Sequence, residues 1–383
     1  MIRALLAGAL ALAAVPAQAQ EAPLNGVWQG SVGNLPIHAC FDERTVEGGI
    51  YYYDRIKQLI RLEGQGDRFD ERVGWAEEGS ATWQLAPVSA TRAEGSWRDG
   101  GRSLPIRLQR VDWEVPDPVV VRGPCESLAF NGPRLTGGQV VETAGLIQGA
   151  PYTVLTWQPP AHFAARTQDE QPTVAIASFA LPERFAGDRA INGVLAAYLP
   201  QDGEIDEYAD CLIALSSFRG IDGYYAQFAM PEVIGDRFVG MVESNDNFCG
   251  GAHPATWQHR RVFDRQSGVE VDPESWLNDA ALARRIVGEQ DYASVYAAPT
   301  DAFRAFLVDH WPQGEDVDPE CAGVALDAYG WDMGLAQGGM VFLPELPRVI
   351  MVCATDVMVS WDELAPWLSL EGQAAAMAFA PRP

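Results

Sequence analysis

Asp-Asn-Phe-Cys-Gly-Gly-Ala-His-Pro, residues 246–254, predicts a sharp turn between two β-strands. Strand-like segments flank it at 237–244 and 256–264, and in the second of these apolar and polar side chains alternate. The neighbouring Gly250 and Gly251 permit backbone conformations that other residues rarely adopt. Cys249 offers a covalent anchor beside them. We therefore expect an anchored hairpin, returned at Ser267-Gly268 into a short strand.

The same turn supplies the candidate site for a ligand or partner. Histidine titrates near neutral pH, so His253 is either a binding group or a latch that hydrogen-bonds the backbone of the turn. Asp246 and Asn247 are either an acidic approach to the site or local turn formers. Tyr224 is either a contact residue or part of the core. The candidate residues are Tyr224, Asp246, Asn247, Gly250, Gly251 and His253.

The region from 119 to 383 mixes helices and strands without a regular alternation, which indicates an α+β domain. Apolar residues at helical spacing after Gly187 predict a helix that ends before Pro200. We expect further helices at 204–215, 279–287, 300–311 and 362–370, and strands that include 152–157, 173–179, 339–343 and 348–354.

The region from 20 to 115 is expected to be a separate N-terminal β-domain. Short apolar segments recur every 8–12 residues between Gly- and Asp-containing turns, which predicts a small antiparallel barrel or sandwich. Its tryptophans either fill the core or form a surface on which carbohydrate stacks: Trp28, Trp75, Trp83 and Trp97. The Pro-rich segment at 115–118 marks the expected boundary.

The N-terminus has the pattern of a secretory signal peptide, residues 1–19. Arg3 precedes an apolar run, and Ala17-Gln18-Ala19 forms a small-residue cleavage site. No later run of ~20 apolar residues would span a bilayer. We therefore expect a periplasmic or secreted protein with no membrane span.

Six cysteines remain after the signal peptide, and an even number in an oxidising compartment indicates disulfides. Six cysteines allow fifteen connectivities, but the separations favour Cys40–Cys125, Cys211–Cys249 and Cys321–Cys353. There is no CxxC or HExxH pattern, so we expect neither a metal nor a cofactor.

The charge is strongly acidic, with 52 Asp and Glu against 27 Lys and Arg and a net charge of −25. Such a surface repels nucleic acid and attracts cationic partners. The simpler alternative is that acidity only maintains solubility.

Catalytic motifs are absent from the sequence: it contains no Gly-x-Ser-x-Gly elbow, phosphate loop or metal triad. Neighbouring carboxylates such as Asp362 and Glu363 imitate a glycosidase pair, but 52 acidic residues produce such pairs by chance. We expect a non-catalytic protein, with a periplasmic glycan hydrolase or esterase as the alternative.

The Gly250-Gly251-Ala252-His253-Pro254 segment resembles the extracytoplasmic domain of RsiV-type anti-sigma factors, which also occurs beside PdaC-type deacetylases. The resemblance covers about 174–372 and includes Asp188-Arg189-Ala190-Ile191-Asn192, Val262-Phe263-Asp264 and Ser267-Gly268. The N-terminal β-domain lies outside it.

RsiV-type domains bind lysozyme, so the resemblance implies recognition of lysozyme-like muramidases or peptidoglycan. We find no transmembrane helix, sigma-binding segment or deacetylase domain in this sequence, so signalling and deacetylation do not carry over. We therefore expect a secreted, non-catalytic binding protein of the cell envelope.

Overall fold

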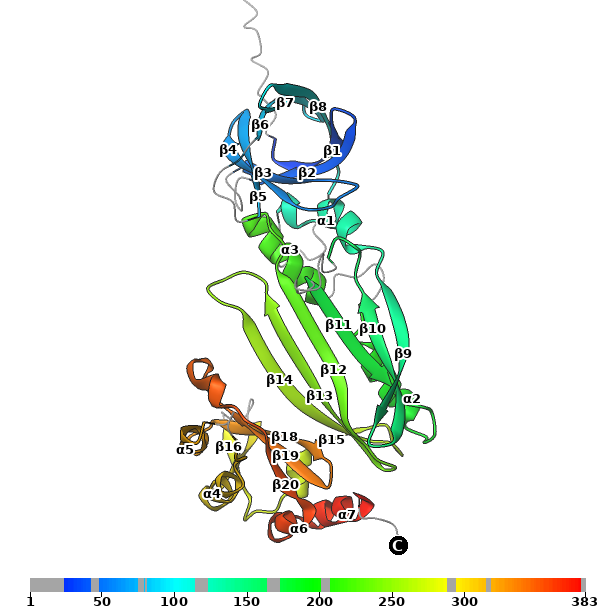
Figure 1. Cartoon of the computed structure of the whole chain (residues 1–383), viewed down its shortest axis with the longest axis vertical. Coiled ribbons are helices and arrows are strands. Elements are labelled where there is room, and N and C mark those ends of the chain that lie inside the picture. The colour runs from blue at the N-terminus through cyan, green and yellow to red at the C-terminus, as the bar shows by residue number, and fades with distance from the viewer. Residues whose placement is uncertain are drawn as a thin grey trace, which may run out of the picture. The chain divides into compact units, whose positions relative to one another are not determined.

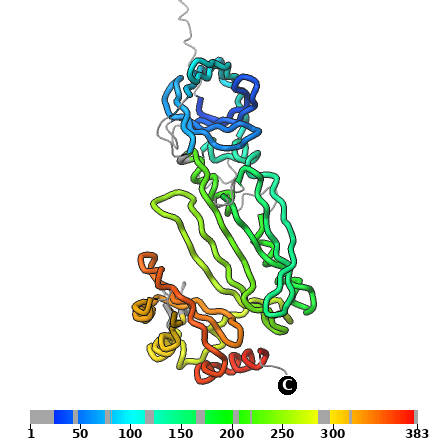
Figure 2. The backbone as a smooth tube through the Cα atoms, viewed as in Figure 1, coloured from blue at the N-terminus to red at the C-terminus, as the bar shows by residue number. Residues whose placement is uncertain are grey.

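The computed structural model describes residues 24–42, 48–74, 79, 81–113, 123–163, 173–200, 207–287, 294–314 and 318–379. The expected signal peptide, the Pro-rich boundary at 115–118 and Trp75 lie outside these residues. The chain divides into two compact units, Met1–Phe130 and Asn131–Pro383 (Figures 1 and 2). The fold class is α+β.

The first unit contains a closed, antiparallel eight-stranded barrel (Figure 1). Closure is made by β1, which pairs with β2 on one side and with β8 on the other. The strands are β1 (Gly26–Val32), β2 (Leu35–Phe41), β3 (Gly48–Tyr53), β4 (Ile60–Gln65), β5 (Arg68–Val73), β6 (Ala81–Ser89), β7 (Arg92–Asp99) and β8 (Arg102–Val111). The sequence left a barrel and a sandwich open, and the barrel is the one formed.

Tryptophans of the barrel pack in its core. Trp28 and Trp83 are fully buried. The indole N–H groups of Trp83 and Trp97 donate to Glu71 Oε1 at 2.7 and 2.8 Å, and the Tyr51 hydroxyl donates to the same oxygen at 2.5 Å. Burial raises the pKa of Tyr51, and the nearby Glu71 carboxylate adds to the effect. These three hydrogen bonds compensate for burying the Glu71 carboxylate.

Outside the barrel, the Cys40–Cys125 disulfide attaches β2 to the 3₁₀ turn η1 (Pro124–Glu126). The following helix α1 (Leu128–Leu135) continues into the second unit. Phe130 on α1 is buried and accepts, at its carbonyl, a hydrogen bond of 2.8 Å from the Tyr52 hydroxyl.

The second unit is built on a seven-stranded sheet of order β15-β14-β13-β12-β11-β10-β9. Neighbouring strands are antiparallel except for β11 and β12, which are parallel. The strands are β9 (Gln139–Ile147), β10 (Ala150–Gln158), β11 (Val174–Ala180), β12 (Tyr224–Ile234), β13 (Phe238–Phe248), β14 (Ala255–Asp264) and β15 (Glu270–Val271).

Helices α2 (Asp188–Ala196) and α3 (Glu207–Arg219) pack on one face of this sheet. Tyr225 packs in the cluster under α3 and Ala229 in the cluster under α2. These two residues are four apart on β12, so their side chains share a face. The expected helix after Gly187 is therefore confirmed, and its apolar side is the buried one.

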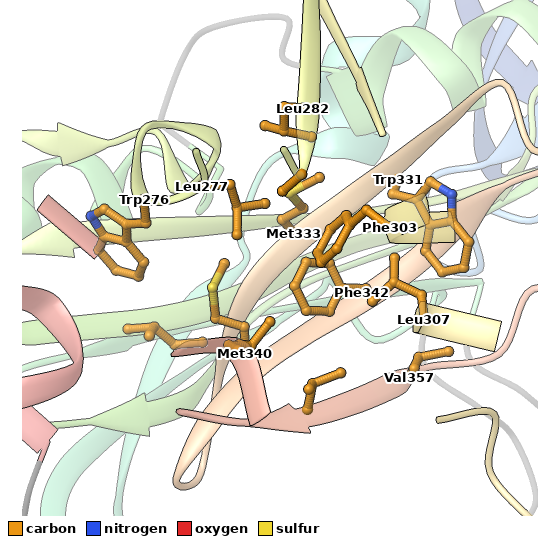
Figure 3. Close-up of a cluster of buried hydrophobic side chains, with 14 of the residues drawn as sticks. Trp276, Leu277, Leu282, Phe303, Leu307, Trp331, Met333, Met340, Phe342 and Val357 are labelled. Carbon is orange, nitrogen blue, oxygen red and sulfur yellow. The ribbon is translucent and has the colours of Figure 1, made fainter. Parts of the chain in front are cut away.

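A three-stranded sheet of β18 (Gly330–Ala336), β19 (Gly339–Glu345) and β20 (Val357–Ser360) packs on the other face of the large sheet, near its β12–β13 turn. The core between them includes Val233, Phe238 and Val262 from the large sheet. Figure 3 shows Trp276, Phe303, Met333 and Phe342 among its members. Helical segments close this core: η2 (Pro273–Trp276), α4 (Asp301–Asp309), α5 (Glu320–Ala325), α6 (Trp361–Leu364), η4 (Ala365–Trp367) and α7 (Leu370–Phe379).

Two expected elements of this region are wrong. The segment 279–287 was expected to be a helix, but it contains the strand β16 (Leu282–Val287), paired with β17 (Ser294–Pro299). The segment 348–354 was expected to be a strand, but Arg348–Cys353 forms the 3₁₀ turn η3, held by the Cys321–Cys353 disulfide. In both cases long-range partners override the local preference.

All three disulfides that the sequence favoured are formed, and no free cysteine remains among the described residues. They are consistent with an extracellular location. Among the described residues, no helix is long and apolar enough to cross a membrane.

Candidate functional site

The turn between β13 and β14 has the geometry that its glycines require. The two strands pair up to Asn247 and Ala255. Gly250 and Gly251 between them adopt φ angles of +107° and +98°, in a region that side chains disfavour. These two glycines are therefore needed for the backbone of the turn.

A disulfide anchors the turn. Cys249 follows the last residue of β13 and is bonded to Cys211 on α3, with 4.5 Å between the two Cα atoms. Cys211 lies in the core beneath α3 with Leu212 and Tyr225. The end of the sheet is thus fixed covalently to the helix that covers one of its faces.

Two candidate residues meet on the face opposite α2 and α3, beyond the part that packs against the three-stranded sheet. Asp246 Oδ1 accepts hydrogen bonds from the hydroxyls of Tyr224 and Thr256, each at 3.1 Å. Burial and the Asp246 hydrogen bond raise the pKa of Tyr224, while the Arg348 guanidinium of η3 opposes the rise. Asp246 and Thr256 are exposed, so this group of three forms an acidic, hydrogen-bonding contact on the surface.

The other candidates lie elsewhere. The strand register places Asn247 on the opposite face from Asp246, and its amide donates to Asn245 Oδ1. His253 is exposed, and its Nδ1 lies 3.2 Å from the carbonyl oxygen of its own neighbour, Pro254. Hence the structure joins Tyr224 to Asp246, but brings neither Asn247 nor His253 to them.

The part of this face beyond the three-stranded sheet extends over the first half of β12, the second half of β13 and the first half of β14. The register puts eight side chains on it: Tyr224, Ala226, Phe228, Ser244, Asp246, Phe248, Thr256 and Gln258. Phe228 is 38% exposed although it lies in the middle of a strand. We call this part of the sheet, residues 224–228, 244–248 and 255–259, the open end.

A buried arginine, missed by the sequence reasoning, lies beside the open end. Arg260 has a side chain only 2% exposed and binds three carboxylates. Its nitrogen atoms lie 3.1 Å from Glu232, 3.5 Å from Asp332 and 2.8 Å from Asp356. Burial raises the pKa of Glu232, and the Arg260 cation opposes that rise.

His259, next to Arg260, forms a second polar contact with β18. Its Nδ1 lies 2.8 Å from Asp332 Oδ1, which raises the pKa of His259. Its ring is 55% exposed, whereas Asp332 is buried. Asp332 also accepts the backbone N–H of Arg260 at 3.1 Å, so one carboxylate fixes both residues.

Arg261 lies on the opposite face of the sheet from Arg260, toward α2. It donates to Glu270 at 2.9 and 2.5 Å and to the Tyr198 hydroxyl at 2.7 Å. Tyr198 in turn donates to Glu243. Burial raises the pKa of Tyr198 to about 12. These contacts join the turn after α2 to β13, β14 and β15.

The arrangement supplies few elements of a catalytic site. His259 is oriented by a carboxylate, but none of the described serine, threonine or cysteine side chains is hydrogen-bonded to it. Glu363 instead takes part in a capping box with Ser360. Within the described residues, no three His, Cys, Asp or Glu side chains are placed to hold a metal ion.

Comparison with known proteins finds similar solved structures, among them two of DUF3298 family proteins. The one from Pseudomonas aeruginosa PAO1 is 13% identical, with 64% of this chain and 97% of the other covered and a TM-score of 0.32. The one from Bacteroides fragilis is 9% identical, with 63% and 96% covered and a TM-score of 0.35. No protein-family model and no curated protein matches the chain. Likenesses this distant carry no argument about function.

Proposed function

We propose that this protein is a non-catalytic binding protein of the cell envelope, exported to the periplasm or beyond. In this proposal it docks lysozyme-like muramidases, or failing these peptidoglycan, through the open end. One observation carries it: the five residues of β14 from Ala255 to His259 are all exposed, although a disulfide fixes the neighbouring strand. A rigid element with no covering layer is suited to docking another macromolecule.

Charge supports a basic partner. The net charge of −25 raises the encounter rate with a cationic protein at low ionic strength, and lysozymes are strongly basic. Asp246 places a carboxylate on the open end itself. The resemblance of residues 250–254 to RsiV-type domains, which bind lysozyme, points to the same class of partner.

Apolar contact would come from η3. Val349 and Val352 are 90% and 91% exposed, which is unusual for two large apolar residues of one turn. Arg348 of the same turn is close enough to Tyr224 to affect its pKa. The proposal therefore combines a charged contact on the sheet with apolar side chains on a disulfide-held turn.

Calorimetric titration of the full chain with a c-type lysozyme tests this proposal. We expect stoichiometric binding at low salt that weakens as ionic strength approaches ~0.15 M. Asp246→Asn should weaken it, while Glu142→Gln should not. Glu142 is the matched control because it removes the same charge from β9, at the opposite edge of the sheet. Absence of heat at low salt would reject the lysozyme version and leave peptidoglycan, tested by co-sedimentation.

The alternative is a glycan hydrolase or esterase, and the His259–Asp332 pair is the observation that favours it. A histidine held by a carboxylate is the usual general base. Purified protein would be incubated with peptidoglycan and acetylated sugar esters. Turnover that His259→Gln abolishes would establish the enzyme and overturn the binding proposal.

A further inference from the structure

Among the described residues, the outer edge of β14 lacks a pairing strand over half its length. On its inner side the strand pairs with β13 over its whole length, without a register shift. On its outer side β15 pairs only with Val262 and Phe263. Among the described residues, no strand pairs with the outer side of Ala255–His259.

The direction of the backbone groups follows from one hydrogen bond. The N–H of Arg260 donates to Asp332 Oδ1, so it points away from β13. Backbone groups alternate in direction along an antiparallel strand. The N–H and C=O groups of Thr256 and Gln258 therefore point outward as well. Asp332 and β15 cover this edge from Arg260 onward and leave it open before that residue.

Exposed edges are usually protected by lysine, proline, a bulge or an inward charge. The segment Ala255-Thr256-Trp257-Gln258-His259 has no lysine, proline or bulge, and its five residues span about 16 Å. Trp257 adds an aromatic surface, 39% exposed, on the face opposite Asp246. Such an edge is a template for an added strand.

We propose that the edge of β14 at Ala255–His259 binds an extended segment of a basic partner protein as an additional β-strand. This inference rests on the proposed docking function and names how the partner is held. Main-chain hydrogen bonds to Thr256 and Gln258 supply the affinity.

Side-chain chemistry defines the partner strand. On the open face, the small Thr256 leaves Asp246 within reach of a long cationic side chain from the added strand. On the opposite face, Trp257 favours an apolar or aromatic side chain. The partner segment should therefore alternate basic and apolar residues. A second copy of this chain would bring two strongly acidic molecules together, which charge opposes.

The test uses the full chain and a capped hexapeptide of alternating lysine and valine. Hydrogen exchange of residues 255–259 should slow when the peptide is added. A peptide of the same sequence, N-methylated at alternate amides, keeps the charge but cannot pair, and it should give no protection. Equal protection by both peptides would overturn the proposal, and that comparison requires no protein variant.

Two variants locate the contact. Gln258→Pro removes an outward N–H and blocks the edge, whereas Gln258→Ala keeps the backbone intact. Proline is tolerated on an edge strand when its missing N–H would face solvent. We expect Gln258→Pro to weaken peptide binding about tenfold or more and Gln258→Ala to change it less than about twofold. Unchanged binding by Gln258→Pro would overturn the proposal.

The two proposals fail in different ways. If lysozyme binds wild type and Gln258→Pro equally, the docking function stands and the strand-addition proposal is rejected. If lysozyme does not bind but the peptide does, the edge is correct and the partner class is wrong. A concentration-dependent dimer that Gln258→Pro abolishes would identify a second copy as the occupant, which overturns the basic partner.

Discussion

Replacing Cys211 and Cys249 with serine removes the covalent link between α3 and the end of β13. The two cysteines are 38 positions apart. In the chain-entropy treatment of crosslinks, closing a loop of this length stabilises the folded state by about 4 kcal/mol. Domains are stabilised by only about 5–15 kcal/mol in total, so the double variant should retain a small margin.

Denaturant unfolding of the full oxidised chain measures this loss, and hydrogen exchange locates it. We expect faster exchange at residues 244–248 and in α3. The matched control is Cys40→Ser with Cys125→Ser, because its separation of 85 positions corresponds to about 4.5 kcal/mol. That control removes a similar amount of stability from the first unit, and it should leave exchange at 244–248 unchanged.

Two results would contradict this prediction: a small loss of unfolding free energy, or faster exchange only outside residues 244–248. A loss below about 1 kcal/mol would mean that the unfolded chain is already restrained without the disulfide, for example by residual contacts around Leu212 and Tyr225. Unchanged exchange at 244–248 would mean that the disulfide does not fix the open end. Either result removes the argument that this part of the sheet is a rigid docking element.

Three further predictions concern single residues near the open end. Arg260→Met should cost about 3–5 kcal/mol, because the buried Asp332 and the partly buried Glu232 lose their cation. In denaturant unfolding, the difference from the wild type should become smaller at acid pH, where the carboxylates are protonated. His259→Gln should reduce the pH dependence of stability: the pKa of His259 is raised above its ordinary 6.5, so its contribution is complete below that value and is lost as pH rises through the raised pKa. The ring is half-exposed, so the effect should stay below ~1 kcal/mol in thermal melts across pH. Gly251→Ala should cost about 1–3 kcal/mol from backbone strain alone, since the space around its Cβ is open, and equal stability in denaturant would contradict the strained φ.

Local sequence signals predicted the elements whose determinants are close together in the chain. The helix after Gly187 has a spaced apolar face, and it ends at Ala196, before Pro200. The turn at Gly250 and Gly251 is encoded by the glycines themselves, and both adopt positive φ. The disulfide pairs were favoured because each closes within one region of the sequence.

Elements determined by distant partners escaped prediction. The segment around β16 is rich in Ala, Leu and Arg, which favour helix, but it pairs with β17 as a strand. The apolar segment of η3 was expected to be a strand, but it forms a 3₁₀ turn in which Val349 and Val352 are exposed. An apolar run that is not buried is a signal that only the structure reveals.

The Arg260 cluster could not be found from the sequence for the same reason. Its carboxylate partners lie 28, 72 and 96 positions away in Glu232, Asp332 and Asp356. In a chain with 52 acidic residues, nothing distinguishes these three. Gly334 makes room for the Arg260 side chain, since a Cβ there would lie 2.5 Å from it. A glycine in the sequence does not show which side chain it makes room for.

The most direct measurement of the central claim is a hydrogen-exchange footprint of the full chain with and without a c-type lysozyme at low salt. The account predicts slower exchange at residues 224–228, 244–248 and 255–259, with the β9 edge unchanged. Protection confined to other surfaces, or no protection at a lysozyme concentration that gives binding heat, would contradict the assignment of the open end as the docking element.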